Sequence, residues 1–414
     1  MSSTMADSAT ARLRLASAQR KVAAFLEQIR HLEASDFPHD DAREALSLIS
    51  EHFEDRLRSL QNLPASVNEV VVEKMCVQTA LVLSRHTDIL GFILRSTNVR
   101  NAFEIHFPLK RLVRKAVSEQ TRLILSSEWN FAPFTYPMNL ESLPDFILIG
   151  APAAESGQAL ITPLAGHEIG HSIWRTPSLQ AAVVSAATHA LAQEIDKDPE
   201  RRDRILKDLS AVRADGDHFK AWALESVVRQ LEEAFSDFVG LYVFGSSYLY
   251  AYEYFLAPGG LSRSVRYPST RSRMEFLKVG AEILEIPVDP SVYLRWQDEK
   301  PRRPIDEEIL AIADAAVEAT IPTVRDLAFE HLRGRDICPP DPLAIARVRA
   351  AFDHHVPDDA GATLAEIVCA GWEYLRERNG LSGVTDKAEY AMLNELMLKT
   401  VEVSEFLLRV DDDA

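Results

Sequence analysis

The stretch LAGHEIGHSIW, residues 164–174, places two histidines four positions apart, with a glutamate directly after the first. In an α-helix, residues i and i+4 lie one turn apart on one face, so His167 and His171 point to the same side. Two imidazoles on that side can share one cation. Ile169 and Ile173 fall on a different face and can bury against a core. The stretch therefore predicts a helix with an apolar side and a metal-binding histidine side.

A second polar pair, in LEEAFSDFVG (231–240), supplies the ligand that two histidines lack. A catalytic zinc takes about three protein ligands and keeps one position open for water. Glu233 can bind zinc through a carboxylate oxygen, and Asp237, one helical turn later, can accept a hydrogen bond from the outer nitrogen of a zinc-bound histidine. Glu232 is the rival ligand, but its i+4 partner Ser236 would orient a histidine less well. We therefore expect Glu233 to complete a Zn²⁺ site, with Asp237 behind it.

Glu168 is the expected general base. Its position next to His167 lets it reach the attacking water without binding the metal itself. A purely structural zinc site has no need of such a base, so an intact Glu168 favours an enzyme. Gly240, further along the second helix, would let the two helices approach closely.

Composition and charge limit the classes of partner. The chain has 414 residues, of which 47% are hydrophobic and 26% are charged, as in ordinary globular proteins. The formal net charge of -17 argues against a general binder of nucleic acid or of anionic membranes, which needs clustered Lys and Arg. Peptide or protein is the expected partner, and nothing in the pattern specifies an oligomeric state.

The cysteines and the N-terminal sequence favour a cytoplasmic location. Cys76, Cys338 and Cys369 are far apart and odd in number, which fits neither a disulfide framework nor a thiolate metal site. The N-terminal segment shows no apolar stretch before a cleavage site, so we expect no secretory signal.

One segment is apolar enough to need a membrane check. Residues 238–256, FVGLYVFGSSYLYAYEYFL, have about the length of a membrane span, but they carry Glu253, two serines and two glycines. They also carry five tyrosines, which prefer the membrane interface over the bilayer centre. We expect a buried helix of a globular core here, and no membrane span.

Periodicity along the chain predicts a mainly α protein with a small β-sheet. Apolar residues recur at helical spacing before residue 120 and again after residue 304, while 122–138 and 146–150 are typical of strands. Prolines between 287 and 304 mark a connector. We therefore expect an N-terminal helical region (1–120), a core (121–280) and a C-terminal helical region (281–414). The strand at 146–150 is the expected edge of a cleft, where a peptide could add as a further strand.

Taken together, His167-Glu168-xx-His171 and Glu233-xxx-Asp237 resemble the gluzincin zinc peptidases, the broad clan of thermolysin. The closer likeness is to the HtpX-like and CAAX-prenyl-protease-like branch. The glycine in HEIGH matches the HE-x-G-H of that branch, and EAFSDFVG (233–240) is similar to its E-x-x-A-D-x-x-A. The later segment YPSTRSR (267–273) is similar to its HP-x-x-x-x-R.

The resemblance covers about residues 145–277 and implies a zincin-like core that hydrolyses peptide bonds. It implies that Arg273 lies in the active-site cleft, while Tyr267 stands where that branch usually has histidine. The expected transmembrane helices of that branch are missing. The ImmA/IrrE-type proteases, which cut cytoplasmic repressors, also carry HE-x-G-H, but their later glutamate lies nearer and in an E-x-x-A-N pattern.

These observations predict a cytoplasmic zinc endopeptidase in which Glu168 takes a proton from water and later passes it to the leaving amine. The developing oxyanion needs a further donor, for which Tyr267, Arg273 and His218 are candidates. The alternatives are a latent or non-catalytic zinc-containing helical protein, a zinc hydrolase acting on something other than a peptide, and an ImmA/IrrE-like regulatory protease.

Overall fold

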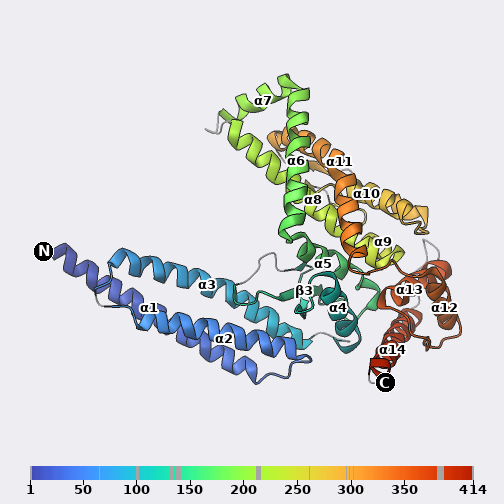
Figure 1. Cartoon of the computed structure of the whole chain (residues 1–414), viewed down its shortest axis with the longest axis horizontal. Coiled ribbons are helices and arrows are strands. Elements are labelled where there is room, and N and C mark those ends of the chain that lie inside the picture. The colour runs from blue at the N-terminus through green and yellow to red at the C-terminus, as the bar shows by residue number, and fades with distance from the viewer. Residues whose placement is uncertain are drawn as a thin grey trace. The chain divides into compact units, whose positions relative to one another are not determined.

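The computed structural model confirms a mainly α-helical chain with a small β content (Figure 1). It describes residues 2–64, 66–98, 102–130, 134–135, 141–210, 216–260, 262–294, 296–297, 299–301, 303–379 and 387–412. By packing, the chain divides into two compact units. The first comprises Met1–Phe103 with Gln120–Gly157, and the second comprises Glu104–Glu119 with Gln158–Ala414. The division into three regions that we expect from the sequence is a separate matter, which this packing does not test, and it stays a prediction.

The first unit is built from three long helices and a small sheet. The helices are α1 (Ser2–Glu33), α2 (Asp40–Gln61) and α3 (Glu69–Arg95), followed by the short turn η1 (Ser96–Asn98). The sheet has the order β1 (Arg122–Glu128), β3 (Phe146–Pro152) and β2 (Phe134–Thr135), with β1 parallel and β2 antiparallel to β3. The two predicted strand segments thus pair with each other, but the end of the first, residues 136–138, lies outside the described residues.

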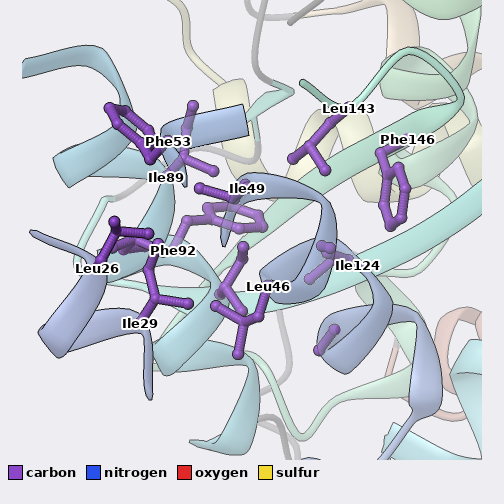
Figure 2. Packing of buried hydrophobic residues seen from close by; sticks show 14 of the residues in the cluster. Leu26, Ile29, Leu46, Ile49, Phe53, Ile89, Phe92, Ile124, Leu143 and Phe146 are labelled. Atoms are coloured by element: carbon purple, nitrogen blue, oxygen red, sulfur yellow. The ribbon is translucent and has the colours of Figure 1, made fainter. Parts of the chain in front are cut away.

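Apolar side chains from all three helices and the sheet form one core in this unit. Figure 2 shows how they pack, with side chains of α1, α2 and α3 meeting those of β1, of β3 and of Leu143 just before β3. The labelled members are Leu26, Ile29, Leu46, Ile49, Phe53, Ile89, Phe92, Ile124, Leu143 and Phe146. Burial of these faces, at about 1.5–3 kcal/mol for each large apolar side chain, stabilises the unit.

The second unit is almost entirely helical. Its elements are α4 (Ala102–Ala116, from Glu104 onward), η2 (Ala159–Ile161), α5 (Leu164–Trp174), α6 (Pro177–Lys197), α7 (Pro199–Ser210), α8 (Gly216–Phe244), α9 (Ser246–Leu256), β4 (Ser262–Arg263), α10 (Thr270–Ile283), η3 (Pro290–Tyr293), β5 (Lys300–Pro301), α11 (Pro304–Arg333), α12 (Pro342–Asp353), α13 (Leu364–Asn379) and α14 (Lys387–Asp412). Strands β4 and β5 pair in parallel over two residues each. Helix α8 is the central element, since α5, α6, α10 and α11 all pack against it.

The apolar segment 238–256 is buried in this unit as two helices. Helix α8 ends at Phe244, and Gly245 takes a positive φ of 55° that starts α9 in a new direction. A positive φ is easily adopted only by glycine, so this residue permits the break. Among the helices that the structure describes, none combines the length and apolarity that a membrane crossing requires.

Helix α6 was not predicted from the sequence. The signal for it is a stripe of small and apolar residues, because Leu179, Val183, Ala187 and Leu191 recur every four positions and are buried. Alanine is the best helix former, yet it contributes little to an apolar pattern, so the stripe is weak in sequence.

Candidate metal centre

Helices α5 and α8 approach each other so closely at two positions of α5 that only glycine fits there. A Cβ atom added to Gly166 would lie 2.9 Å from the Cα of Gly240, and one added to Gly170 would lie 2.5 Å from the Cα of Ser236. Ile169, on the side of α5 away from the two histidines, is fully buried. Gly166 and Gly170 thus let α5, with its two histidines, lie directly against α8.

Three side chains meet between these two helices. The Nε2 atoms of His167 and His171 are 3.1 Å apart, and carboxylate oxygens of Glu233 lie 3.4 Å and 3.7 Å from them, respectively. Among the described residues, this set is the group of three ligand-type side chains that could hold a metal ion.

The dimensions of this group fit a zinc ion. Zinc binds imidazole nitrogen and carboxylate oxygen at about 2.0–2.2 Å in a tetrahedral arrangement, which separates neighbouring ligand atoms by about 3.3–3.6 Å. The distances between His167, His171 and Glu233 are close to that value. Two imidazoles and one carboxylate are also a ligand set that catalytic zinc sites use.

Each histidine has a carboxylate on its outer nitrogen. The Nδ1 of His167 lies 2.9 Å from Oδ1 of Asp237, and the Nδ1 of His171 lies 3.2 Å from Oε1 of Glu232. The other carboxylate oxygen of Glu232 accepts a 3.0 Å hydrogen bond from Arg229. An acceptor at Nδ1 keeps the proton on that atom, so the Nε2 lone pair is directed at the metal position. Glu232, weighed from the sequence as a rival ligand, therefore contacts the back of the second histidine.

Burial and charge act strongly on these groups. Burial lowers the pKa of His167, but the carboxylates of Asp237 and Glu233 more than offset this and raise it to about 10. The pKa of Glu233 is lowered, since the hydrogen bond from His167 and the charge of Arg273 outweigh the opposing effect of burial. The site is therefore a place where positive charge, either a proton or a metal ion, is strongly favoured.

Glu168 lies in the same helix as the two histidines and is almost fully buried. Burial raises the pKa of its carboxyl above the ordinary value, against the lowering effect of His167 and His171. A raised pKa makes a carboxylate a stronger base, which is the property a general base for water needs.

Arg273 lies on α10 and reaches both acidic residues of the ExxxD pair. Its Nε donates to Oδ2 of Asp237 at 2.7 Å and its Nη2 donates to Oδ1 at 2.6 Å, while Nη1 lies 3.6 Å from Oε2 of Glu233. The guanidinium stands over the ring of Tyr252, 5.1 Å from its centroid. The resemblance implied that Arg273 lies in the active-site cleft, and the structure brings it to the candidate ligand Glu233 and to Asp237 behind His167.

The other two candidates for an oxyanion donor have different positions. Half of the surface of Tyr267 is exposed, and the negative charges of Glu233 and Glu168 add to burial in raising the pKa of its hydroxyl. His218 is exposed, 6.3 Å from the ring of Trp222. It precedes Glu233 by fifteen residues of α8, about 22 Å at the rise of an α-helix, so the structure does not bring it to the metal ligands.

Sequence reasoning missed the part that Tyr248 takes in this site. Its hydroxyl donates a 2.6 Å hydrogen bond to Oδ1 of Asp237, from helix α9. The sequence analysis treated residues 238–256 as a buried apolar segment, and Tyr248 is indeed fully buried. A buried tyrosine hydroxyl needs a hydrogen-bond partner, which is the one signal that could have pointed to it.

Comparison with known proteins returned no match to a family model, to a curated protein or to a solved structure.

Proposed function

We propose that this protein is a zinc-dependent peptidase, in which His167, His171 and Glu233 hold the metal and Glu168 is the general base. The observation that carries the proposal is the convergence of these three ligand side chains, whose ligand atoms lie within 4.8 Å of one another: the two histidines from α5, which also carries Glu168, and Glu233 from α8. The resemblance of HEIGH, EAFSDFVG and YPSTRSR to the HtpX-like and CAAX-prenyl-protease-like gluzincins supports a peptide as the substrate.

The number of ligands favours an active site over a structural one. A structural zinc site is closed by four protein ligands, whereas a catalytic site keeps one position for water. Within the described ranges, the ligand group contains three residues. Glu168, directly after the first histidine, has no place in a structural site but is what hydrolysis requires.

A bound zinc ion would supply a Lewis acid that acidifies water and polarises the carbonyl of the scissile bond. Glu168 accepts the proton of the attacking water and then delivers it to the leaving amine. Its burial keeps its carboxylate poorly solvated and therefore basic. Tyr267, half exposed and within the field of Glu168 and Glu233, is the donor that we assign to the developing oxyanion.

The proposal includes the cytoplasm as the compartment. Cys76, Cys338 and Cys369 are all free thiols, as is usual for proteins of a reducing environment. A peptide or protein of that compartment is the proposed substrate.

The test combines zinc content with cleavage of a mixed unstructured peptide library, for wild type and Glu168→Gln. We expect one zinc per chain in both proteins and cleavage in the wild type alone. Glu155→Gln serves as the matched control, because it changes a glutamate that lies outside the ligand group and should cleave like wild type. Absence of zinc in the wild type, or equal cleavage by Glu168→Gln, would refute the proposal.

A further inference from the structure

Asp237 is the most heavily hydrogen-bonded carboxylate of the candidate site. Its Oδ1 accepts from Nδ1 of His167, from Nη2 of Arg273 and from the hydroxyl of Tyr248, and its Oδ2 accepts from Nε of Arg273. The side chain is almost completely buried. Burial raises the pKa of Asp237, but the charge and hydrogen bonds of Arg273 and His167 more than offset this and hold it below the usual range.

The local fold is arranged so that the ring of Tyr248 can reach Asp237. The positive φ of Gly245 breaks the helix between the two residues and lets α9 return against α8. Gly240, one turn beyond Asp237, leaves the room that the ring occupies, since a Cβ atom there would lie 2.4 Å from Cε2 of Tyr248. Gly240 and Gly245 together thus allow the hydroxyl of Tyr248 to reach Asp237.

We propose that Tyr248 is a positioning residue of the metal centre: its hydroxyl holds the carboxylate of Asp237 in the orientation that directs the Nε2 of His167 at the metal. This inference rests on the proposed zinc site. The hydroxyl of Tyr248 lies 3.5 Å from Nδ1 of His167 and 2.6 Å from Oδ1 of Asp237, so its hydrogen bond is donated to the carboxylate and not to the imidazole.

The role follows from how a carboxylate is fixed. Arg273 binds both oxygens of Asp237 from one side, as a planar fork. The hydroxyl of Tyr248 adds a donor from a different helix, α9, so that rotation of the carboxylate about its own axis is opposed from two elements. Partners of this kind behind a metal-bound histidine typically change metal affinity by about 10- to 100-fold.

Tyr252 provides a matched control one turn further along α9. It is also a buried tyrosine and its ring packs beneath Arg273, but its hydroxyl has no hydrogen-bond partner among the residues that the structure describes. The substitution Tyr252→Phe therefore removes the same atom from the same helix without removing a contact to Asp237.

The experiment compares Zn²⁺ dissociation constants of the wild type, Tyr248→Phe and Tyr252→Phe, by competition with a chromophoric chelator. We expect Tyr248→Phe to bind Zn²⁺ about 10-fold or more weakly and Tyr252→Phe to bind within twofold of the wild type. The visible spectrum of bound Co²⁺ should change in Tyr248→Phe alone, which a general loss of stability would not produce.

A second measurement uses the metal-free protein. Nitrogen-15 NMR should show the Nδ1–H of His167 shifted in Tyr248→Phe relative to the wild type, and unshifted in Tyr252→Phe. In the wild type itself, the Tyr248 hydroxyl proton should exchange slowly with solvent, and rapid exchange would overturn the proposal even if the variant fails to fold. If the wild type binds Zn²⁺ tightly and Tyr248→Phe has the same dissociation constant, this inference is overturned and the peptidase proposal stands. If the wild type does not bind Zn²⁺, both are overturned.

Discussion

The imidazoles of His167 and His171 face each other with their Nε2 atoms 3.1 Å apart. Each ring has a carboxylate at its outer nitrogen, which favours a proton on Nδ1 and leaves Nε2 to face the other ring. Two Nε2 lone pairs at that distance would repel each other, so a proton or a metal ion between the rings is favoured, and the negative charge of Glu233 beside them adds to this. The arrangement is therefore one that a metal ion stabilises.

Neighbouring glutamates on α8 should differ sharply in their importance for metal binding. Glu233 faces both Nε2 atoms, whereas Glu232 contacts the outer nitrogen of His171. We expect Glu232→Gln to weaken Zn²⁺ binding by about 10- to 100-fold, as for partners of bound histidines, and Glu233→Gln to weaken it by more than that. Isothermal titration with Zn²⁺ measures both. A larger loss of Zn²⁺ affinity in Glu232→Gln than in Glu233→Gln would show that Glu232 is the ligand.

The close approach of α5 and α8 should not tolerate a methyl group at Gly170. In Gly170→Ala the new Cβ would lie 2.5 Å from a backbone atom, the Cα of Ser236, so the helices must separate. We expect a loss of stability of about 1–3 kcal/mol, as for overpacked cores, together with weaker Zn²⁺ binding.

Gly91→Ala, near the C-terminal end of α3, is the control for this substitution. The nearest atom to its Cβ is Nη1 of Arg95, at 3.0 Å, which is the far end of a side chain and not a backbone atom, so we expect a smaller loss of stability there than in Gly170→Ala. Urea denaturation of both variants measures the change in the free energy of unfolding. An equal effect at the two positions would contradict the close packing of α5 on α8.

Removing Arg273 should destabilise the second unit, because a buried carboxylate would lose its partner. Arg273→Met leaves Asp237 without its two guanidinium hydrogen bonds, which costs about 3–5 kcal/mol for a buried pair. Arg273→Lys keeps the charge but loses the planar fork, so it should fall between wild type and Arg273→Met. Chemical denaturation measures the effect. Wild-type stability of Arg273→Met would show that the pair contributes nothing.

A histidine in the first unit should make its stability depend on pH. His86 is buried, with Nδ1 2.8 Å from the carbonyl oxygen of Val82 and Nε2 2.8 Å from the hydroxyl of Ser142. Burial lowers the pKa of His86 from 6.5, and the stacked ring of His52 lowers it further. The unfolded chain therefore binds more protons than the folded one below about pH 6.5, and stability falls as the pH decreases through that value.

The measurement is the urea midpoint at pH 7.5 and pH 5.5, for wild type and His86→Gln. Other groups titrate in the same range, so the difference between the two proteins isolates the histidine. We expect the wild type to lose more stability on acidification than His86→Gln does. An equal or smaller loss in the wild type would show that His86 accepts a proton in the folded state at no cost.

The sequence predicted those relationships in the candidate site that join residues of the same helix. His167 and His171 share a face because of the helical repeat, and the same repeat puts Glu233 one turn from Asp237. The meeting of the two pairs was a hypothesis about tertiary structure, which their joint occurrence suggested and their spacing could not prove. The mainly α fold class followed from the same periodicity.

The contacts that the sequence analysis missed depend on where the chain changes direction, and the spacing of apolar residues carries no information about that. Tyr248 reaches Asp237 only because Gly245 turns the chain between two helices. Glu232 could have been placed, since neighbouring residues on a helix point about 100° apart and so cannot both serve the same metal. His218 was expected near the site on residue type alone, and the length of α8 separates it from Glu233.

The most direct test of the central claim is anomalous diffraction at the zinc K edge, from crystals of the protein grown with Zn²⁺. We predict one strong peak at about 2.0–2.2 Å from Nε2 of His167, from Nε2 of His171 and from a carboxylate oxygen of Glu233. A peak elsewhere in the chain, with no density between these three side chains, would contradict the assignment of this site to zinc.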